Sequence, residues 1–113
     1  MEFPHIEDKI RFLEECITEL EKQLRLREEQ REQFLLEIEE KVLDIRNEMY
    51  RLGDPIPQTP LRTALEHEIK NLERERRSTE VEFWRDVNEL RRDLRQLKKE
   101  YRSVRAGAIW SKK

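Results

Sequence analysis

The fold is decided by the stretch Gly53-Asp54-Pro55-Ile56-Pro57-Gln58-Thr59-Pro60, which lies near the middle of the 113-residue chain. It holds three of the four prolines and one of the two glycines. A helix cannot run through it, because proline lacks the backbone N–H and its ring clashes with the preceding turn. The segments on either side, residues 5–52 and 61–106, contain neither proline nor glycine. The stretch therefore predicts a loop that folds a second long helix back along the first.

The flanking residues predict where the helices begin and end. We expect the first helix over about residues 4–52, the loop at 53–60, the second helix over about 60–106 and a short basic tail to residue 113. Thr59 suits the N-cap of the second helix. Gly53 is expected to take a positive φ after the first helix, and Gly107 to mark fraying of the second. Together these elements make one structural unit, a single helical hairpin.

Apolar residues recur at alternate steps of three and four along both segments, which is the heptad pattern of a coiled coil. Each series is interrupted by two consecutive steps of four, a stutter that locally unwinds a supercoil. We call these positions the seam. In the first helix it comprises Ile6, Ile10, Leu13, Ile17, Leu20, Leu24, Arg27, Arg31, Leu35, Ile38, Val42, Ile45, Met49 and Leu52. In the second it comprises Leu65, Ile69, Leu72, Arg76, Thr79, Phe83, Val87, Leu90, Leu94, Leu97, Tyr101, Val104 and Ala108.

The two seams match when the chain is folded at the loop. In an antiparallel pair the residue numbers of facing positions have a constant sum, and here every seam position except Leu52 has a partner when that sum is 114. Arg31 then faces Phe83, so the two stutters lie opposite each other. Two unrelated helices would not show this agreement. The sequence therefore predicts an all-α fold, a long antiparallel two-helix coiled-coil hairpin.

Composition limits the class of protein. Charged residues make up 44% of the chain and hydrophobic residues 35%, which suits long helices with a narrow apolar seam better than a globular core. The net charge of −2 gives no general attraction to nucleic acid or anionic lipid. A single cysteine, Cys16, allows no internal disulfide. With no long apolar run and no basic, apolar start, we expect a soluble cytoplasmic protein without a membrane segment.

Catalytic and metal-binding patterns are missing from the sequence. It has no nucleophile–base pair and no glycine-rich phosphate loop. His5, Cys16 and His67 are too far apart along a hairpin to ligate one metal ion. We therefore expect no catalytic residue, no metal site, no cofactor and no enzymatic activity.

The residues most expected to carry function are apolar side chains off the seam. Leu36, Leu43 and Tyr50 recur every seven residues and form a second stripe, on the flank of the hairpin that also carries Trp84. Scattered surface apolar residues are the ordinary alternative, but a contiguous patch marks a protein contact. Two hairpins are then expected to dimerise into a four-helix arrangement. The predicted interface residues are Phe34, Leu36, Leu43, Tyr50, Val81 and Trp84.

A basic stretch near the C-terminus is a second candidate surface. Residues 91–113 hold nine bases and two acids, whereas residues 1–22 hold seven acids and three bases. The hairpin lays these segments side by side, so mutual neutralisation is the simpler explanation, and nucleic-acid binding is the alternative. The basic residues proposed for it are Arg91, Arg92, Arg95, Lys98, Lys99, Arg102 and Arg105.

Three arginines occupy seam positions, namely Arg27, Arg31 and Arg76. Such polar layers cost stability but exclude slipped pairings, provided that carboxylates lie within reach. Nearby acids are Glu28, Glu82 and Asp86. The alternative is a bound anion.

The sequence favours a coiled-coil protein–protein interaction or scaffold module that self-associates through the central apolar residues. The second interpretation is a finger-like accessory subunit that docks on a larger machine, such as a polymerase, ribosome or motor, by its Pro-rich loop or its central patch. The third is a nucleic-acid-binding protein that uses the basic C-terminal end.

Overall fold

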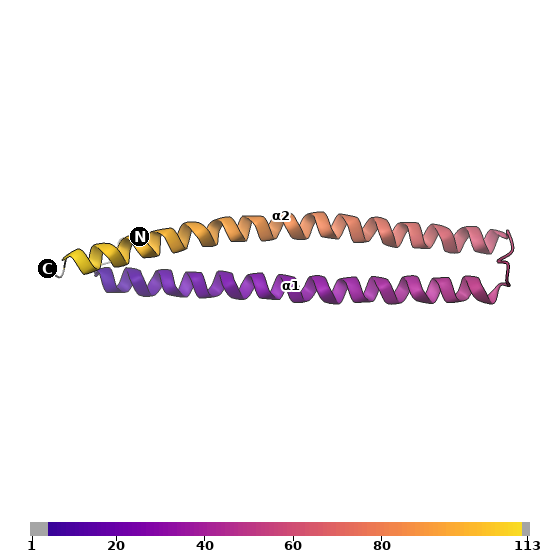
Figure 1. The fold of residues 1–113 in the computed structure, drawn as a ribbon, viewed down its shortest axis with the longest axis horizontal. Helices are drawn as coiled ribbons and strands as arrows, with labels where there is room; N and C mark the ends of the chain where they lie inside the picture. Colours follow the sequence, from indigo (N-terminus) through magenta and orange to yellow (C-terminus); the bar gives the residue numbers. More distant parts are fainter. Residues whose placement is uncertain (1–4, 112–113) are drawn as a thin grey trace. The chain divides into compact units, whose positions relative to one another are not determined.

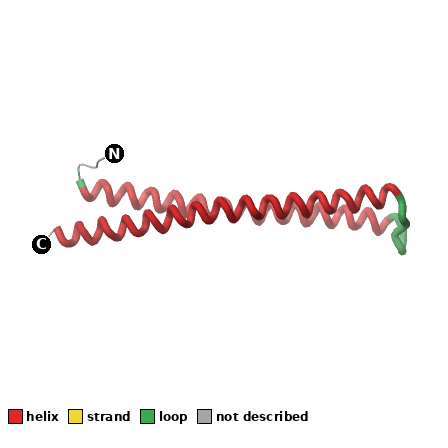
Figure 2. The backbone as a smooth tube through the Cα atoms, turned by 90° about the horizontal axis from the view of Figure 1, so that it is seen from above, coloured by secondary structure: helices red, strands yellow, loops and turns green. Residues whose placement is uncertain are grey.

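The computed structural model describes residues 5–111 of the chain. They form two helices, α1 (Ile6–Arg51) and α2 (Pro60–Ser111), joined by a loop at residues 52–59 (Figure 1). Figure 2 shows helix and loop and no strand over these residues. The predicted all-α helical hairpin is confirmed. Its dimerisation into a four-helix arrangement stays a prediction.

The observed helix bounds differ from the expected ones at one end. The expected start near Pro4 lies outside the described residues, and α2 begins at Pro60 as predicted. The expected end of α2 near residue 106 was wrong, because the helix continues through Gly107 to Ser111. One glycine costs a helix only about 1 kcal/mol relative to alanine, and Gly107 stands between two alanines, the strongest helix formers. The glycine therefore does not end the helix.

The packing of the helices divides the molecule into two compact units. Unit 1 is Met1–Arg27 with Arg85–Lys113, and unit 2 is Glu28–Trp84. In both helices the boundary falls within the predicted stutter. Each unit is an antiparallel pair of helical segments and is described by itself below.

Unit 1 is centred on Leu13 and Val87, which are both buried. The other seam residues from Ile10 to Leu24 on α1 and from Leu90 to Val104 on α2 are half-buried, as the heptad pattern predicts. Polar contacts near the chain ends also join the segments. The Tyr101 hydroxyl donates to Glu14 Oε1 at 2.8 Å, and Lys9 Nζ lies 3.4 Å from Glu100 Oε1. Both contacts bring the start of α1 against the end of α2, which is the antiparallel order.

Unit 2 is centred on Ile38 and Leu65, which are both buried, and its seam is otherwise mostly half-buried. The predicted pairing of Arg31 with Phe83 is confirmed, since the guanidinium carbon lies 5.2 Å from the ring centroid. Arg76, unlike the other two seam arginines, is exposed. An arginine can lay its stem on apolar surface and extend its charged head into water.

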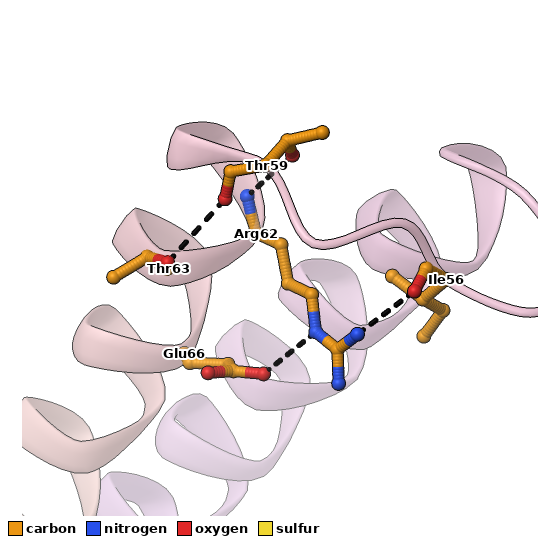
Figure 3. Close-up of polar contacts among 5 residues, drawn as sticks. All are labelled: Ile56, Thr59, Arg62, Thr63 and Glu66. Atoms are coloured by element: carbon orange, nitrogen blue, oxygen red, sulfur yellow. Dashed lines mark hydrogen bonds and ion pairs between the residues drawn. The ribbon is translucent and has the colours of Figure 1, made fainter.

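The loop between the helices is held at both ends. Gly53 follows α1 with a φ of +143°, a backbone conformation open mainly to glycine. Thr59 is the N-cap of α2, because its Oγ1 accepts a hydrogen bond from the Arg62 backbone N–H at 3.2 Å (Figure 3). The Thr59 carbonyl accepts the next one, from the Thr63 N–H at 3.1 Å. These bonds fix the entry into α2 as the sequence predicts.

Arg62 ties the loop to α2. Its Nη1 donates to the Ile56 carbonyl at 2.8 Å, and its Nε donates to Glu66 Oε1 at 2.9 Å (Figure 3). Ile56 is half-buried, whereas Pro55 and Pro57 are exposed. The loop is therefore an anchored turn rather than a slack connector.

Neither helix, over the residues that the structure describes, has a stretch long and apolar enough to cross a membrane.

Candidate functional site

The main candidate site is a row of apolar side chains on the outer surface of α1 in unit 2. Leu36 is 55% exposed, Leu43 is 58% exposed and Tyr50 is 68% exposed. Their spacing of seven residues, nearly two helical turns, places them on one face about 10 Å apart. We call these three residues the apolar stripe. The stripe is accessible to a partner without any rearrangement of the seam.

The other predicted interface residues lie in different surroundings. Val81 and Trp84 of α2 are 58% and 44% exposed. Phe34 is half-buried, and two residues of α-helix separate it from Leu36 by about 200°, on the opposite flank. The apolar stripe, Val81 and Trp84 thus form the accessible part of the predicted set.

Trp84 belongs to a cluster at the stutter that we call the Arg31 cluster, made of Arg31, Glu80, Phe83 and Trp84. The Arg31 guanidinium lies 5.2 Å from the Phe83 ring centroid and 5.9 Å from that of Trp84. The two rings meet edge to face, with centroids 5.3 Å apart. Arg31 Nε and Nη2 each lie 2.9 Å from Glu80 Oε1. Cation–π attraction and a charge-assisted hydrogen bond thus hold the same guanidinium.

The negative charge of Glu80 in the Arg31 cluster is stabilised by groups of the same chain. The hydrogen bond from Arg31 lowers the pKa of the Glu80 carboxyl, and a second hydrogen bond from Trp84 and the charge of Arg76 act in the same direction. Partial burial opposes them and is outweighed. Because Arg31 already faces a carboxylate, the cluster is a polar layer of the seam more than a binding site for an external anion.

The sequence analysis missed Glu80 as the partner of Arg31. It named Glu28, Glu82 and Asp86, of which Asp86 does lie 4.0 Å from Arg27. The spacing of Glu80 from the seam residue Phe83 would have identified it as the partner. Glu80 precedes the seam partner Phe83 by three residues, and residues three apart are neighbours on a helix surface.

The basic stretch lies on α2 in unit 1, and all seven of its predicted residues are exposed. Two of them make local contacts along the helix. Arg105 donates to the Tyr101 hydroxyl at 3.1 Å, and Arg102 donates to the Lys98 carbonyl at 3.3 Å. The stretch is an accessible charged surface, and its Arg105 guanidinium lies 5.6 Å from the ring centroid of Tyr101.

Open grooves follow the helix pairs, among them one in each unit. Within residues 5–111 no group of three or more His, Cys, Asp or Glu side chains is placed to hold a metal ion. The groove of unit 1, about 480 Å³, is lined by Cys16, Glu19, Leu20, Asp93, Gln96 and Leu97. The groove of unit 2, about 420 Å³, is lined by Lys41, Asp44, Ile45, Glu68, Asn71, Leu72 and Glu75.

The fold and its surface define the class of protein, an antiparallel helical hairpin with an exposed apolar stripe. Comparisons with protein-family models, with curated protein sequences and with solved structures found no match to this chain.

Proposed function

We propose that the chain is a non-enzymatic protein–protein interaction module that self-associates through the apolar stripe and the residues beside it. The observation that supports this proposal is the exposure of Leu36, Leu43 and Tyr50, each more than half accessible, at regular spacing on one helix. Isolated apolar side chains on a surface are ordinary. A row of three large ones on a chain with 44% charged residues is not explained by the hairpin's own packing.

The energetics favour burial of this row. Each large apolar side chain that leaves water contributes about 1.5–3 kcal/mol. A two-fold dimer uses the same surface on both copies, so every residue contributes twice. The sum competes with several kcal/mol of lost translational and rotational freedom.

The second candidate function is docking of the hairpin on a larger assembly by its loop. The observation that favours it is the anchoring of the loop by Arg62 and Thr59, which presents Pro55 and Pro57 to solvent in a fixed conformation. A preorganised loop pays less ordering entropy on binding than a slack one. The two candidates differ in the mass of the purified chain, which is that of a dimer only in the first.

The decisive experiment replaces two residues of the stripe. We expect Leu36→Glu with Leu43→Glu to convert a dimer into a monomer, because buried unpaired carboxylates add a desolvation cost to the lost apolar contact. Helicity should survive, because both side chains are exposed outside the seam. Sedimentation equilibrium measures the mass and circular dichroism the helix content. Trp84 is left in place, since its ring contacts Arg31.

The matched control is Leu61→Glu. Leu61 is 53% exposed, close to the 55% of Leu36, and lies in the first turn of α2, on the other helix from the stripe. This variant should keep the wild-type mass. Equal masses for the wild type and the stripe variant would show that the stripe takes no part in self-association.

A further inference from the structure

We propose that the self-association is antiparallel, with α1 of one copy packed against α1 of a second copy and the two-fold axis at Leu43. This inference rests on the proposed function and specifies its partner, orientation and register. The residues that carry it, 36–50, all lie in unit 2 and in α1.

The apolar stripe is symmetric about its middle residue. Leu36 lies seven residues before Leu43, and Tyr50 lies seven residues after it. A two-fold interface requires that if residue i contacts residue j, then j contacts i. In an antiparallel pair centred on Leu43, the numbers of facing residues add up to 86. Leu43 then faces Leu43 of the second copy. Leu36 of each copy faces Tyr50 of the other, which gives two symmetric contacts.

The charges beside the stripe favour the antiparallel orientation over the parallel one. Glu39 and Arg46 are seven residues apart and lie along one edge of the stripe, while Glu40 and Asn47 lie along the other. Antiparallel packing brings each Glu39 beside Arg46 of the second copy, and each Glu40 beside Asn47. In-register parallel packing instead brings each edge against the opposite edge, so that Glu39 lies beside Glu40 of the second copy and Arg46 beside Asn47. That arrangement places like charges together and has no Glu–Arg pair, so it is disfavoured.

The side chains that would pair across the interface are exposed to solvent. Glu39, Glu40, Arg46 and Asn47 are all exposed. Within the described residues, the ion pairs of the chain involve other groups and leave Glu39 and Arg46 without a partner. The charged side chains at the edges of the stripe are therefore not engaged within the hairpin. After a two-fold rotation, each edge of one copy meets the same edge of the second copy with complementary groups.

Cysteine cross-linking of the full chain tests orientation and register. In a Cys16→Ser background, Leu43→Cys should form a disulfide between two copies under mild oxidation, because the two thiols face each other across the axis. Leu36→Cys alone should not link. A mixture of the Leu36→Cys and Tyr50→Cys chains should link to each other. Linking of Leu36→Cys to itself would overturn the antiparallel orientation, because only a parallel pair places those positions together.

Charge reversal tests the same register without a covalent bond. Glu39→Arg and Arg46→Glu should each weaken self-association by about tenfold or more, because each places two like-charge pairs at the interface. Mixing the two variants should restore wild-type affinity as a heterodimer, since every edge pair is then complementary. A mixture no tighter than the separate variants would overturn the proposed pairing.

Failure of this inference is distinguishable from failure of the proposed function. A wild-type chain that sediments as a monomer at every concentration overturns both. A wild-type dimer that depends on Leu36 and Leu43, but in which Leu43→Cys does not link, leaves self-association standing and overturns the two-fold axis at Leu43.

Discussion

At the scale of single residues, Arg31 explains how a charged side chain is accommodated in an apolar seam. Its guanidinium pairs with Glu80 and lies over the rings of Phe83 and Trp84. The side chains of Arg31 and Glu80 are 32% and 27% exposed, so the pair is only partly removed from water. Partial solvation keeps the desolvation cost small, and the geometry limits which residue can face Arg31. The layer thus contributes more to register than to stability.

The lowered pKa of Glu80 predicts a pH-dependent contribution to stability. A carboxyl whose folded-state pKa lies below its ordinary value of 4.5 stabilises the fold above that pH, and the contribution is lost as the pH falls through the lower folded-state pKa. Glu80→Gln should therefore cost about 1 kcal/mol at pH 7, after allowance for solvent screening. The difference from wild type should shrink toward zero as the pH falls below 4.5 and through the lower folded-state pKa of Glu80. Urea unfolding at a series of pH values measures it.

The control for this experiment is Glu82→Gln. Glu82 is an exposed carboxylate two residues further along α2. Its replacement should change the free energy of unfolding at pH 7 by less than about 0.5 kcal/mol. A Glu80→Gln difference that stays constant from pH 7 to pH 3 would show that the pair with Arg31 does not contribute through ionisation.

At the scale of the helices, α2 shows which sequence signals for a helix end are strong and which are weak. Thr59 and Pro60 start the helix where they stand in the sequence, because the threonine Oγ1 satisfies the backbone N–H of Arg62 and the proline lacks an N–H to satisfy. Gly107 is a weak signal by comparison. Its cost in a helix is small, and α2 continues past it.

The N-cap gives a prediction for α2. Thr59→Ala should lower the free energy of unfolding by about 1 kcal/mol, because an N–H at the start of the helix loses its acceptor. Thr63→Ala is the matched control. Its hydroxyl donates at 3.3 Å to a carbonyl that already accepts the Thr63 N–H, so its loss should cost nothing or stabilise slightly. Thermal unfolding of both variants measures the difference. Equal melting temperatures would contradict the role of Thr59 as the N-cap of α2.

At the scale of the whole molecule, the two helices run antiparallel in each unit with the register set by their seams. The contacts of Lys9 with Glu100 and of Arg27 with Asp86 order unit 1, and that of Arg31 with Glu80 orders unit 2. The boundary between the units coincides with the stutter in both helices. Within unit 2, Arg31 lies against Phe83, as the facing stutters predict.

A disulfide within one chain tests this register. In a Cys16→Ser background, Leu20→Cys with Leu94→Cys should oxidise within single chains at low protein concentration, because both positions occupy the same layer of unit 1. Leu20→Cys with Leu90→Cys is the control, because one helical turn of about 5.4 Å separates these layers. Gel mobility and mass under non-reducing conditions measure the outcome. Links found only between chains would indicate an exchanged arrangement of helices.

The sequence alone determined the two helices, the loop, the N-cap and the register of the seams. It did so because helical periodicity and the backbone limits of proline and glycine are local properties that each residue carries into any context. Where burial is described, at residues 5–107, the core has four buried side chains, and all were predicted seam positions: Leu13, Ile38, Leu65 and Val87.

Only the tertiary structure decided how the long side chains are used. Arg31 is half-buried against Glu80, whereas Arg76, also a seam position, is exposed. The Arg31 guanidinium lies over the Trp84 ring as well as over that of Phe83, and Arg62 holds the loop through the Ile56 carbonyl. The physical reason is that a long flexible side chain has several acceptors and rings within reach. Which of them it contacts depends on the packing of both helices, not on its position in the sequence.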